Sequence, residues 1–307
     1  MNKRRVITIP VSEDFNFSEC YWFLDRNYDD CLHRLKEGRI IKALRVNDQP
    51  VLLSIRVDAD RLLAEVLHVE KNGEGLEEGI RGYLSAWLDM DRDLSAFYGL
   101  LRKDKRLAYM PDQYRGLRLV GVVDLFESLC WSVIGQQINL RFAYTLKRRL
   151  VERYGRKLVY EGETYHLFPD PTALAMAKIA DLRDMQFSER KAAYLIGLAG
   201  VFARGELSRE ILAGLPDLES RQQALMQLKG VGVWTANYCL MKTLREPSCI
   251  PYGDTGLLTA LANHGVIKDR KEEGKINRFF KQYAGWESYL VFYLWRSLSE
   301  RVVKDNA

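Results

Sequence analysis

The strongest chemical signal in the chain is the stretch 224–241, ALMQLKGVGVWTANYCLM. Apolar residues at helical spacing flank Gly230-Val231-Gly232 on both sides, which predicts two short helices joined by a tight turn. Glycine adopts conformations that other residues avoid and lets another backbone come close. The amides of such a turn, together with the start of the next helix, can hold a phosphate oxygen without reading a base. The pattern indicates a helix–hairpin–helix, although a plain helix connection also fits it.

A carboxylate follows the hairpin some twenty residues later, at Asp254. Pro251 and Gly253 predict a constrained turn before it, and a leucine-containing helix begins after it. The common role of an aspartate in this place is a helix N-cap. A second role is open, because a hairpin that holds phosphates would bring a sugar close to the carboxylate. Asp254 would then stabilise positive charge that develops at C1′ of that sugar.

Composition narrows the kind of site and partner. The five cysteines form no C-x-x-C pair and the four histidines form no H-E-x-x-H pattern, so we expect no metal bound by side chains. Residues 1–114 carry a net charge of −2 and residues 115–307 a net charge of +7, which indicates a surface for a polyanion in the second part. No apolar run reaches the roughly 18 residues of a membrane span, and no signal-peptide pattern is present. We therefore expect no membrane partner and a cytoplasmic protein, associated with the nucleoid if the source is bacterial.

Periodicity divides the chain into two parts. In the first part, residues 17–35 and 76–108 have helical spacing, and short β-branched stretches between turn residues predict strands. The strand-like stretches are 6–9, 40–46, 51–57 and 61–69, of which the last three predict an antiparallel meander. From about 117 to 300 nearly every segment has helical period. We expect a mainly α chain, with a small α+β N-terminal domain plus connecting helix over 1–112 and an all-α domain over 113–307.

Several stretches together resemble the helix–hairpin–helix/GPD superfamily of DNA glycosylases. LKGVGVWTANY and the loop before Asp254 resemble its hairpin and catalytic loop, and SVIGQQI at 132–138 resembles the segment along its DNA-penetrating loop. Residues 168–171, 190–192 and 286–289 resemble its other helical segments. The chain is most similar to the branch of 3-methyladenine DNA glycosylases II (AlkA). This resemblance implies two helical subdomains that flank an active-site cleft, after a small α+β domain.

The resemblance also implies roles for individual residues. Asp254 is the expected catalytic residue, and Trp234, Tyr238 and Trp295 are expected to form the base pocket, because electron-rich rings suit cationic bases. The expected DNA-binding residues are Gly230, Val231, Gly232, Thr235, Gln136 and Gln137, the last as the wedge that fills the gap left by a flipped base. The hairpin of the family also binds a monovalent cation through backbone carbonyls, for which the candidates are Met226, Leu228 and Val231. Thr255 stands where the best-known AlkA has tyrosine, which puts the substrate range in doubt.

Two absences favour one chemistry within the superfamily. Bifunctional members carry a lysine just after the hairpin glycines, which attacks C1′, whereas this chain has Val233 and Trp234 there. No cysteine follows Cys249, so the four-cysteine iron–sulfur loop of other members is missing and no cofactor is expected. The resemblance therefore implies a monofunctional, monomeric DNA glycosylase that flips and hydrolytically excises alkylated bases, of the 3-methyladenine and 7-methylguanine type, from duplex DNA and so starts base excision repair. Two alternatives stay open: a non-catalytic helix–hairpin–helix DNA-binding module, and a glycosylase for oxidised or deaminated purines.

Overall fold

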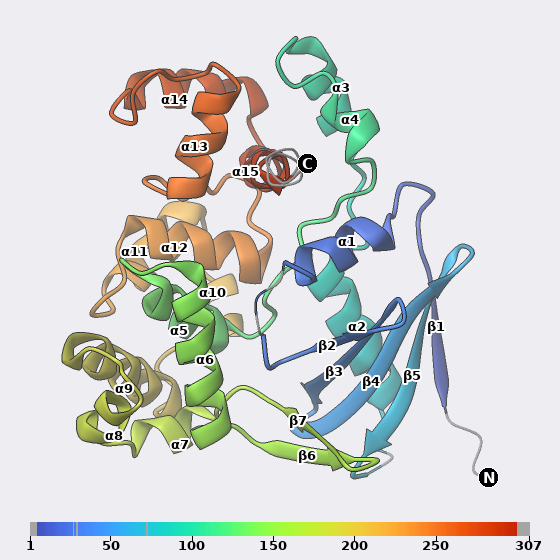
Figure 1. Ribbon diagram of the computed structural model, residues 1–307, viewed down its shortest axis with the longest axis vertical. Coiled ribbons are helices and arrows are strands. Elements are labelled where there is room, and N and C mark those ends of the chain that lie inside the picture. The colour runs from blue at the N-terminus through green and yellow to red at the C-terminus, as the bar shows by residue number, and fades with distance from the viewer. Residues whose placement is uncertain (1–4, 27, 29, 72, 300–307) are drawn as a thin grey trace, which may run out of the picture.

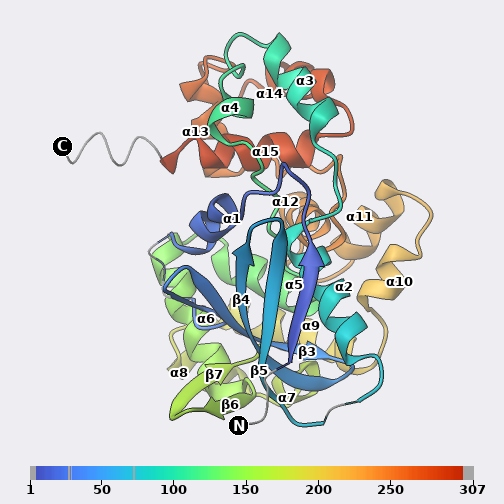
Figure 2. The ribbon, with the colours of Figure 1, turned by 90° about the vertical axis from the view of Figure 1, so that its right-hand side faces the viewer.

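The computed structural model describes residues 5–26, 28, 30–71 and 73–299. A five-stranded antiparallel sheet lies at one side of the molecule, and most of the helices form two groups (Figures 1 and 2). The prediction of a mainly α chain with a small α+β N-terminal part is confirmed. Among the described residues, no helix combines the length and the apolar character that crossing a membrane requires.

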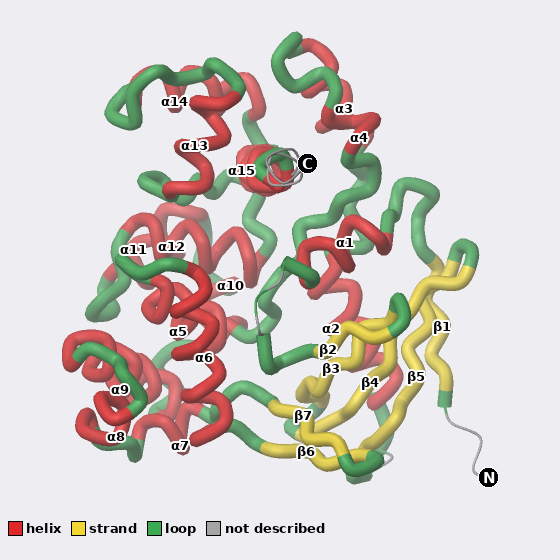
Figure 3. The backbone as a smooth tube through the Cα atoms, viewed as in Figure 1, coloured by secondary structure: helices red, strands yellow, loops and turns green. Residues whose placement is uncertain are grey.

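The N-terminal sheet has five strands in the order β1-β5-β4-β3-β2, all antiparallel (Figure 3). The strands are β1 (Val6–Pro10), β2 (Arg34–Lys36), β3 (Arg39–Val46), β4 (Gln49–Asp58) and β5 (Arg61–Val69). Asn47 and Asp48 both have positive φ, which gives the two-residue turn between β3 and β4 a twist that matches the strands. The predicted meander is confirmed, and the structure adds the pairing of β1 with β5.

The helix predicted over 17–35 is wrong in its second half. Helix α1 (Phe17–Leu24) is capped by Asn16 and ends at Leu24. Beyond it the polar run that starts at Asp25 favours turns, and the Asp30 side chain accepts the Leu32 amide before β2 begins. Helix α2 (Leu76–Leu88) covers the sheet by burying Leu76, Ile80, Leu84 and Leu88, which recur at four-residue spacing.

The two groups of helices are built from different parts of the chain. The upper group in Figure 2 contains α3 (Ser95–Lys103), α4 (Met110–Gln113), α13 (Thr255–Asn263), α14 (Glu273–Phe280), the short 3₁₀ helix η2 (Lys281–Tyr283) and α15 (Glu287–Arg296). The lower group contains α5 (Leu125–Gly135), α6 (Leu140–Tyr154), α7 (Pro171–Ala175), α8 (Ile179–Asp184), α9 (Glu189–Ala203), α10 (Arg209–Ala213), α11 (Leu218–Met226), α12 (Val233–Cys239) and the π-helical turn η1 (Leu240–Leu244).

The second part of the chain is not all-α, which corrects that prediction. Strands β6 (Lys157–Tyr160) and β7 (Glu163–His166) form a two-stranded hairpin. Glu161 and Gly162 both have positive φ in its turn. Leu158 and Tyr165 pack on residues of the N-terminal sheet, so the hairpin covers apolar surface there. The alternation in KLVYEGETYH and its Glu-Gly turn carried this signal.

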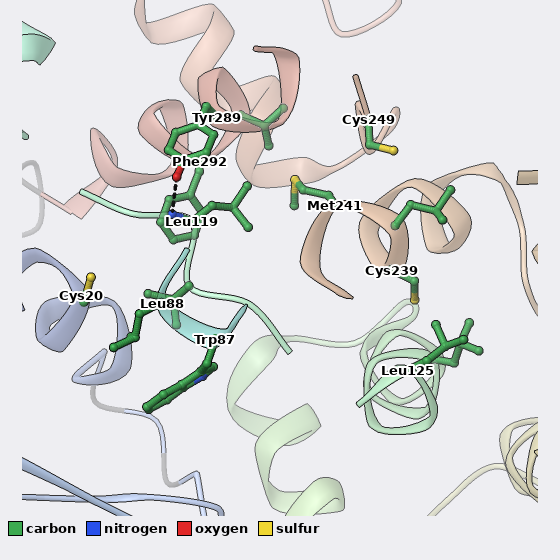
Figure 4. Packing of buried hydrophobic residues seen from close by; sticks show 14 of the residues in the cluster. Cys20, Trp87, Leu88, Leu119, Leu125, Cys239, Met241, Cys249, Tyr289 and Phe292 are labelled. Atoms are coloured by element: carbon green, nitrogen blue, oxygen red, sulfur yellow. Dashed lines mark hydrogen bonds between the residues drawn. The ribbon is translucent and has the colours of Figure 1, made fainter. Parts of the chain in front are cut away.

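A shared apolar core joins the two parts of the chain. Cys130 of α5 and Cys239 of α12 are fully buried in it. In Figure 4, Tyr289 and Phe292 of α15 lie beside Leu119, whose amide donates to the Tyr289 hydroxyl over 3.4 Å. Because α1, α2, α5, α12 and α15 contribute to this core, the helices around Asp254 are held to the N-terminal part.

Candidate active site

The two glycines of the hairpin between α11 and α12 have different environments. Gly230 has φ +88°, and a Cβ built there would lie 2.4 Å from Cδ2 of the Tyr194 ring on α9. Gly232 has extended backbone, and a Cβ there would meet no protein atom within 4 Å. Gly230 is therefore required by packing. The open space at Gly232 leaves room for a ligand backbone, and the adjacent start of α12 has amides that are not used within the helix.

Gln136 connects the hairpin to the end of α5. Its Nε2 donates to the carbonyl of Gly230 over 2.8 Å and to Oγ1 of Thr235 over 3.3 Å. Thr235 is only 2% exposed, so its side chain is directed into the protein. The side chain of Thr235 is therefore not available to DNA, and the predicted DNA-binding role of this residue stays a prediction. Gln136 and Thr235 instead hold the hairpin and the α5–α6 loop together.

Gln137 is presented by the α5–α6 loop. It is exposed and has φ +57°, which lies in the left-handed region that residues other than glycine rarely adopt. Lys191 of α9 donates to the carbonyl of Ile134 over 2.7 Å and so supports the same loop. The wedge role of Gln137 stays a prediction, and the held backbone conformation is consistent with it.

Asp254 is both a helix cap and a member of a polar pair. Its Oδ1 accepts the amide of Leu257 over 2.7 Å at the start of α13 and also accepts Nε1 of Trp295 over 2.9 Å. None of the described residues donates to Oδ2. Gly256 is close enough that an added Cβ would lie 3.2 Å from Oδ1. One oxygen is thus fixed in place, and the other stays available to a ligand or water.

The three predicted pocket residues lie together beside Asp254. The rings of Trp234 and Tyr238 stack with centroids 5.4 Å apart, and the Tyr238 and Trp295 rings follow at 6.4 Å. Nε1 of Trp131 donates to the Tyr238 hydroxyl over 3.2 Å. Burial raises the pKa of Tyr238, so this ring stays neutral at physiological pH. All three predicted rings are partly exposed.

No clear cation site is formed by side chains in the described parts of the chain. There, no three His, Cys, Asp or Glu side chains cluster as metal ligands. The carbonyl of Leu228 accepts the amide of Val231 over 3.1 Å, and the carbonyls of Met226, Leu228 and Val231 stay predicted ligands of a monovalent cation. Two surface cavities, of about 440 and 410 Å³, lie elsewhere and do not include Asp254.

Comparison with known families decides what kind of protein carries this site. Residues 130–284 match the HhH-GPD superfamily of base excision DNA repair proteins. The chain belongs to the HhH-GPD superfamily. Residues 16–129 match the 8-oxoguanine DNA glycosylase N-terminal domain. The expected superfamily is thereby confirmed.

Relatives in the superfamily cover most of the chain. A DNA-3-methyladenine glycosylase of Bacillus subtilis (strain 168) is 34% identical over 295 residues, which is 95% of this chain and 97% of the relative. DNA-3-methyladenine glycosylase 2 of Escherichia coli (strain K12) is 30% identical over 183 residues, which is 59% of this chain and 60% of the relative. The solved structure of a 3-methyladenine DNA glycosylase from Archaeoglobus fulgidus has a TM-score of 0.81 at 22% identity, over 96% of this chain and 98% of that one. A Clostridium acetobutylicum 8-oxoguanine glycosylase/lyase in complex with DNA has a TM-score of 0.76 at 19% identity, over 98% of both chains.

Sequence reasoning missed part of the aromatic surround of this HhH-GPD site. The rings of Trp131 in α5 and Tyr144 in α6 have centroids 4.6 Å apart and are tilted by 47°, and Phe23 and Arg26 come from the N-terminal part. Trp131 lies one residue before the SVIGQQI segment, which was a usable signal. Phe23 and Arg26 carry no comparable sequence signal, since only the tertiary fold brings α1 and the residues after it to α15.

A charge at Gly232 should weaken binding to any DNA duplex. The hairpin amides are predicted to hold a phosphate, which the carboxylate of Gly232→Asp would face, so we expect the dissociation constant for undamaged duplex to rise about tenfold or more. The salt dependence of binding should become shallower because one phosphate contact is lost. Fluorescence anisotropy at several salt concentrations measures both quantities.

Gly99→Asp is the matched control for this variant. Gly99 is an exposed glycine of α3, and a Cβ there also meets nothing within 4 Å. The Gly99→Asp variant adds the same negative charge at a site away from the hairpin. If the two variants bind DNA equally well, the hairpin is only a connector between helices.

Proposed function

We propose that this chain is a monofunctional DNA glycosylase that flips alkylated bases, of the 3-methyladenine and 7-methylguanine type, out of duplex DNA and hydrolyses their N-glycosidic bonds. The proposal includes a monomer whose N-terminal α+β domain spans 1–112 and whose glycosylase domain spans 113–307, acting in the cytoplasm as the first enzyme of base excision repair. It is supported by the DNA-3-methyladenine glycosylases that are similar over most of the chain.

The observation that carries the proposal is the placement of Asp254. Oδ1 of Asp254 accepts a hydrogen bond from Trp295 and so fixes the carboxylate next to this ring. Tyr238 and Trp234 continue the row of partly exposed aromatic rings from Trp295. A flipped purine stacked on Trp234, Tyr238 or Trp295 would bring its sugar to the carboxylate. Cationic bases gain about 0.5–2 kcal/mol from such rings. A pure DNA-binding module would use Asp254 only as a helix cap, a role that asparagine or serine fills without repelling phosphates.

The reaction needs one carboxylate and one water molecule. The C1′–N bond breaks, its electron pair moves into the base, and the sugar takes up positive charge that Asp254 stabilises. Water then adds to C1′, and its proton passes to Asp254 and on to solvent. A cationic base leaves as a neutral molecule, so it requires no general acid.

The product should be an intact abasic strand. The positions that hold the nucleophilic lysine in bifunctional members are Val233 and Trp234. Lys242 is 2% exposed, donates to the carbonyl of Val120 and lies against two aromatic rings, so it does not reach the sugar. We expect that strands are cut only after alkali or an abasic-site endonuclease is added, and that borohydride traps no covalent complex. Enzyme-dependent cleavage with a trapped adduct would place the protein in the bifunctional branch.

The experiment that tests the proposal is release of free bases from methylated duplex DNA, resolved by chromatography. The alternative that a specific observation favours is excision of an oxidised purine, because residues 16–129 match the 8-oxoguanine DNA glycosylase N-terminal domain. The same measurement on oxidised duplex DNA distinguishes a glycosylase for alkylated bases from one for oxidised purines. Neutral 8-oxoguanine has a strong glycosidic bond, and no acid partner of Asp254 is found among the described residues to protonate it, so we expect slow release.

A further inference from the structure

Seven side chains form a closed ring of contacts next to Asp254, and two of them come from the N-terminal part. The successive contacts are Tyr238–Trp295 (centroids 6.4 Å), Trp295–Phe292 (6.4 Å), Phe292–Phe23 (4.8 Å), Phe23–Arg26 (guanidinium carbon to centroid 4.2 Å), Arg26–Tyr144 (Nη2 to hydroxyl 3.4 Å), Tyr144–Trp131 (4.6 Å) and Trp131–Tyr238 (Nε1 to hydroxyl 3.2 Å). Six members are aromatic. Arg26 is the one charged member of this ring.

The guanidinium of Arg26 is held by aromatic groups. It lies over Phe23, is 5.8 Å from the centroid of the Tyr28 ring and donates to the hydroxyl of Tyr144. Among the described residues, no carboxylate forms an ion pair with it. Its charge therefore acts on a base that binds against these side chains, in surroundings that screen charge less than water does.

The other nearby amine does not replace this charge. Lys242 lies 4.4 Å from the centroid of Phe23 and 4.9 Å from that of Phe292, and its Nζ donates to the carbonyl of Val120. Burial lowers the pKa of Lys242 well below its usual value, which favours the neutral amine. An arginine stays charged in proteins.

We propose that Arg26 is an electrostatic residue of the base pocket that draws the electron pair of the breaking C1′–N bond into the departing base. This inference rests on the proposed function. Along the ring of contacts, two members separate Arg26 from Trp295 and two separate it from Tyr238, and Asp254 is fixed to Trp295. A positive charge at the base and a negative charge at the sugar act together, because bond cleavage moves electrons from the sugar to the base.

The effect differs between two classes of substrate. A cationic base such as 7-methylguanine is repelled by Arg26 while it is bound, and the repulsion fades as the base becomes neutral. Arg26 thus weakens binding of this base and speeds its release. A neutral base such as hypoxanthine departs with negative charge, which the guanidinium stabilises until water protonates the base. In both cases water adds to C1′ and its proton passes through Asp254 to solvent.

The test compares Arg26→Met with wild type in single-turnover excision at several enzyme concentrations. Methionine keeps much of the length and removes the charge. We expect hypoxanthine release to slow at least tenfold. For 7-methylguanine we expect the maximal rate to fall while the half-saturating enzyme concentration also falls, a combination that the loss of a structural contact alone does not produce. Arg26→Lys, which keeps a charge, should retain most of the hypoxanthine rate.

Arg56→Met is the matched control, because Arg56 lies on the sheet and pairs with the exposed Asp58 over 3.4 Å. It should leave both substrates unaffected. Unchanged rates in Arg26→Met, or equal losses for both substrates together with weaker binding, would overturn the inference while wild-type base release still upheld the proposed function. A wild-type protein that releases no base from either duplex would overturn both.

Discussion

Replacing Asp254 by asparagine should reduce base release at least about 100-fold, while the protein stays folded and binds DNA. The loss corresponds to about 2.7 kcal/mol or more of transition-state stabilisation by the carboxylate. Asparagine keeps an oxygen at the position of Oδ1, so it can still accept the Leu257 amide and Nε1 of Trp295. Because asparagine caps helices as well as aspartate does, α13 should not be affected. Single-turnover excision and thermal unfolding of Asp254→Asn measure the two quantities.

Asp93→Asn is the control for this prediction. The Asp93 side chain also accepts a backbone amide, that of Ser95, at the start of α3 and away from the aromatic ring. This variant should excise bases as wild type does. Near-normal excision by Asp254→Asn would remove the carboxylate from the mechanism and leave it only the role of a cap.

Replacing Gly230 by alanine should lower the free energy of unfolding by about 2–4 kcal/mol. The methyl group would lie 2.4–2.9 Å from three atoms of the Tyr194 ring, and φ +88° is strained for any side chain. Gly232→Ala is the matched substitution two residues away, where the backbone is extended and the space is open, so it should stay within about 0.5 kcal/mol of wild type. Urea unfolding of the two variants gives the comparison.

A second variant separates the two causes of this loss. In a Tyr194→Ala background the methyl group no longer meets the ring, so the cost of Gly230→Ala should fall to the backbone strain of about 1–3 kcal/mol. Equal stabilities of Gly230→Ala and Gly232→Ala would show that the hairpin tolerates a side chain at either position.

Local pattern was enough to locate the meander, the hairpin and the helix after Asp254. Each of these depends on neighbours in the chain: turn residues between β-branched stretches, or two glycines between apolar helices. The helix predicted over 17–35 is wrong after Leu24. Apolar spacing continues beyond this residue, but the polar run that starts at Asp25 favours turns. The hairpin formed by β6 and β7 is not predicted, because its short alternating stretch lies between long segments that have helical period.

The site was predictable only as far as its residues lie in recognisable segments. Trp234, Tyr238, Trp295 and Asp254 come together as expected, although their roles stay predictions. The inward direction of Thr235 could not be inferred, since it depends on a hydrogen bond from Gln136 almost a hundred residues earlier. Arg26 is also beyond local pattern, because it reaches the ring through tertiary contacts, the packing of Phe23 on Phe292 and its own hydrogen bond to Tyr144.

The most direct test of the account is base release from one duplex preparation that carries methylated and oxidised purines together, with wild type and Asp254→Asn in parallel. Free bases are quantified in the soluble fraction, and the strands are analysed before and after alkali. The account predicts that wild type releases 3-methyladenine and 7-methylguanine well ahead of 8-oxoguanine, that strands stay intact until alkali is added, and that the variant releases almost nothing. Preferential release of 8-oxoguanine, or no dependence of release on Asp254, would contradict it.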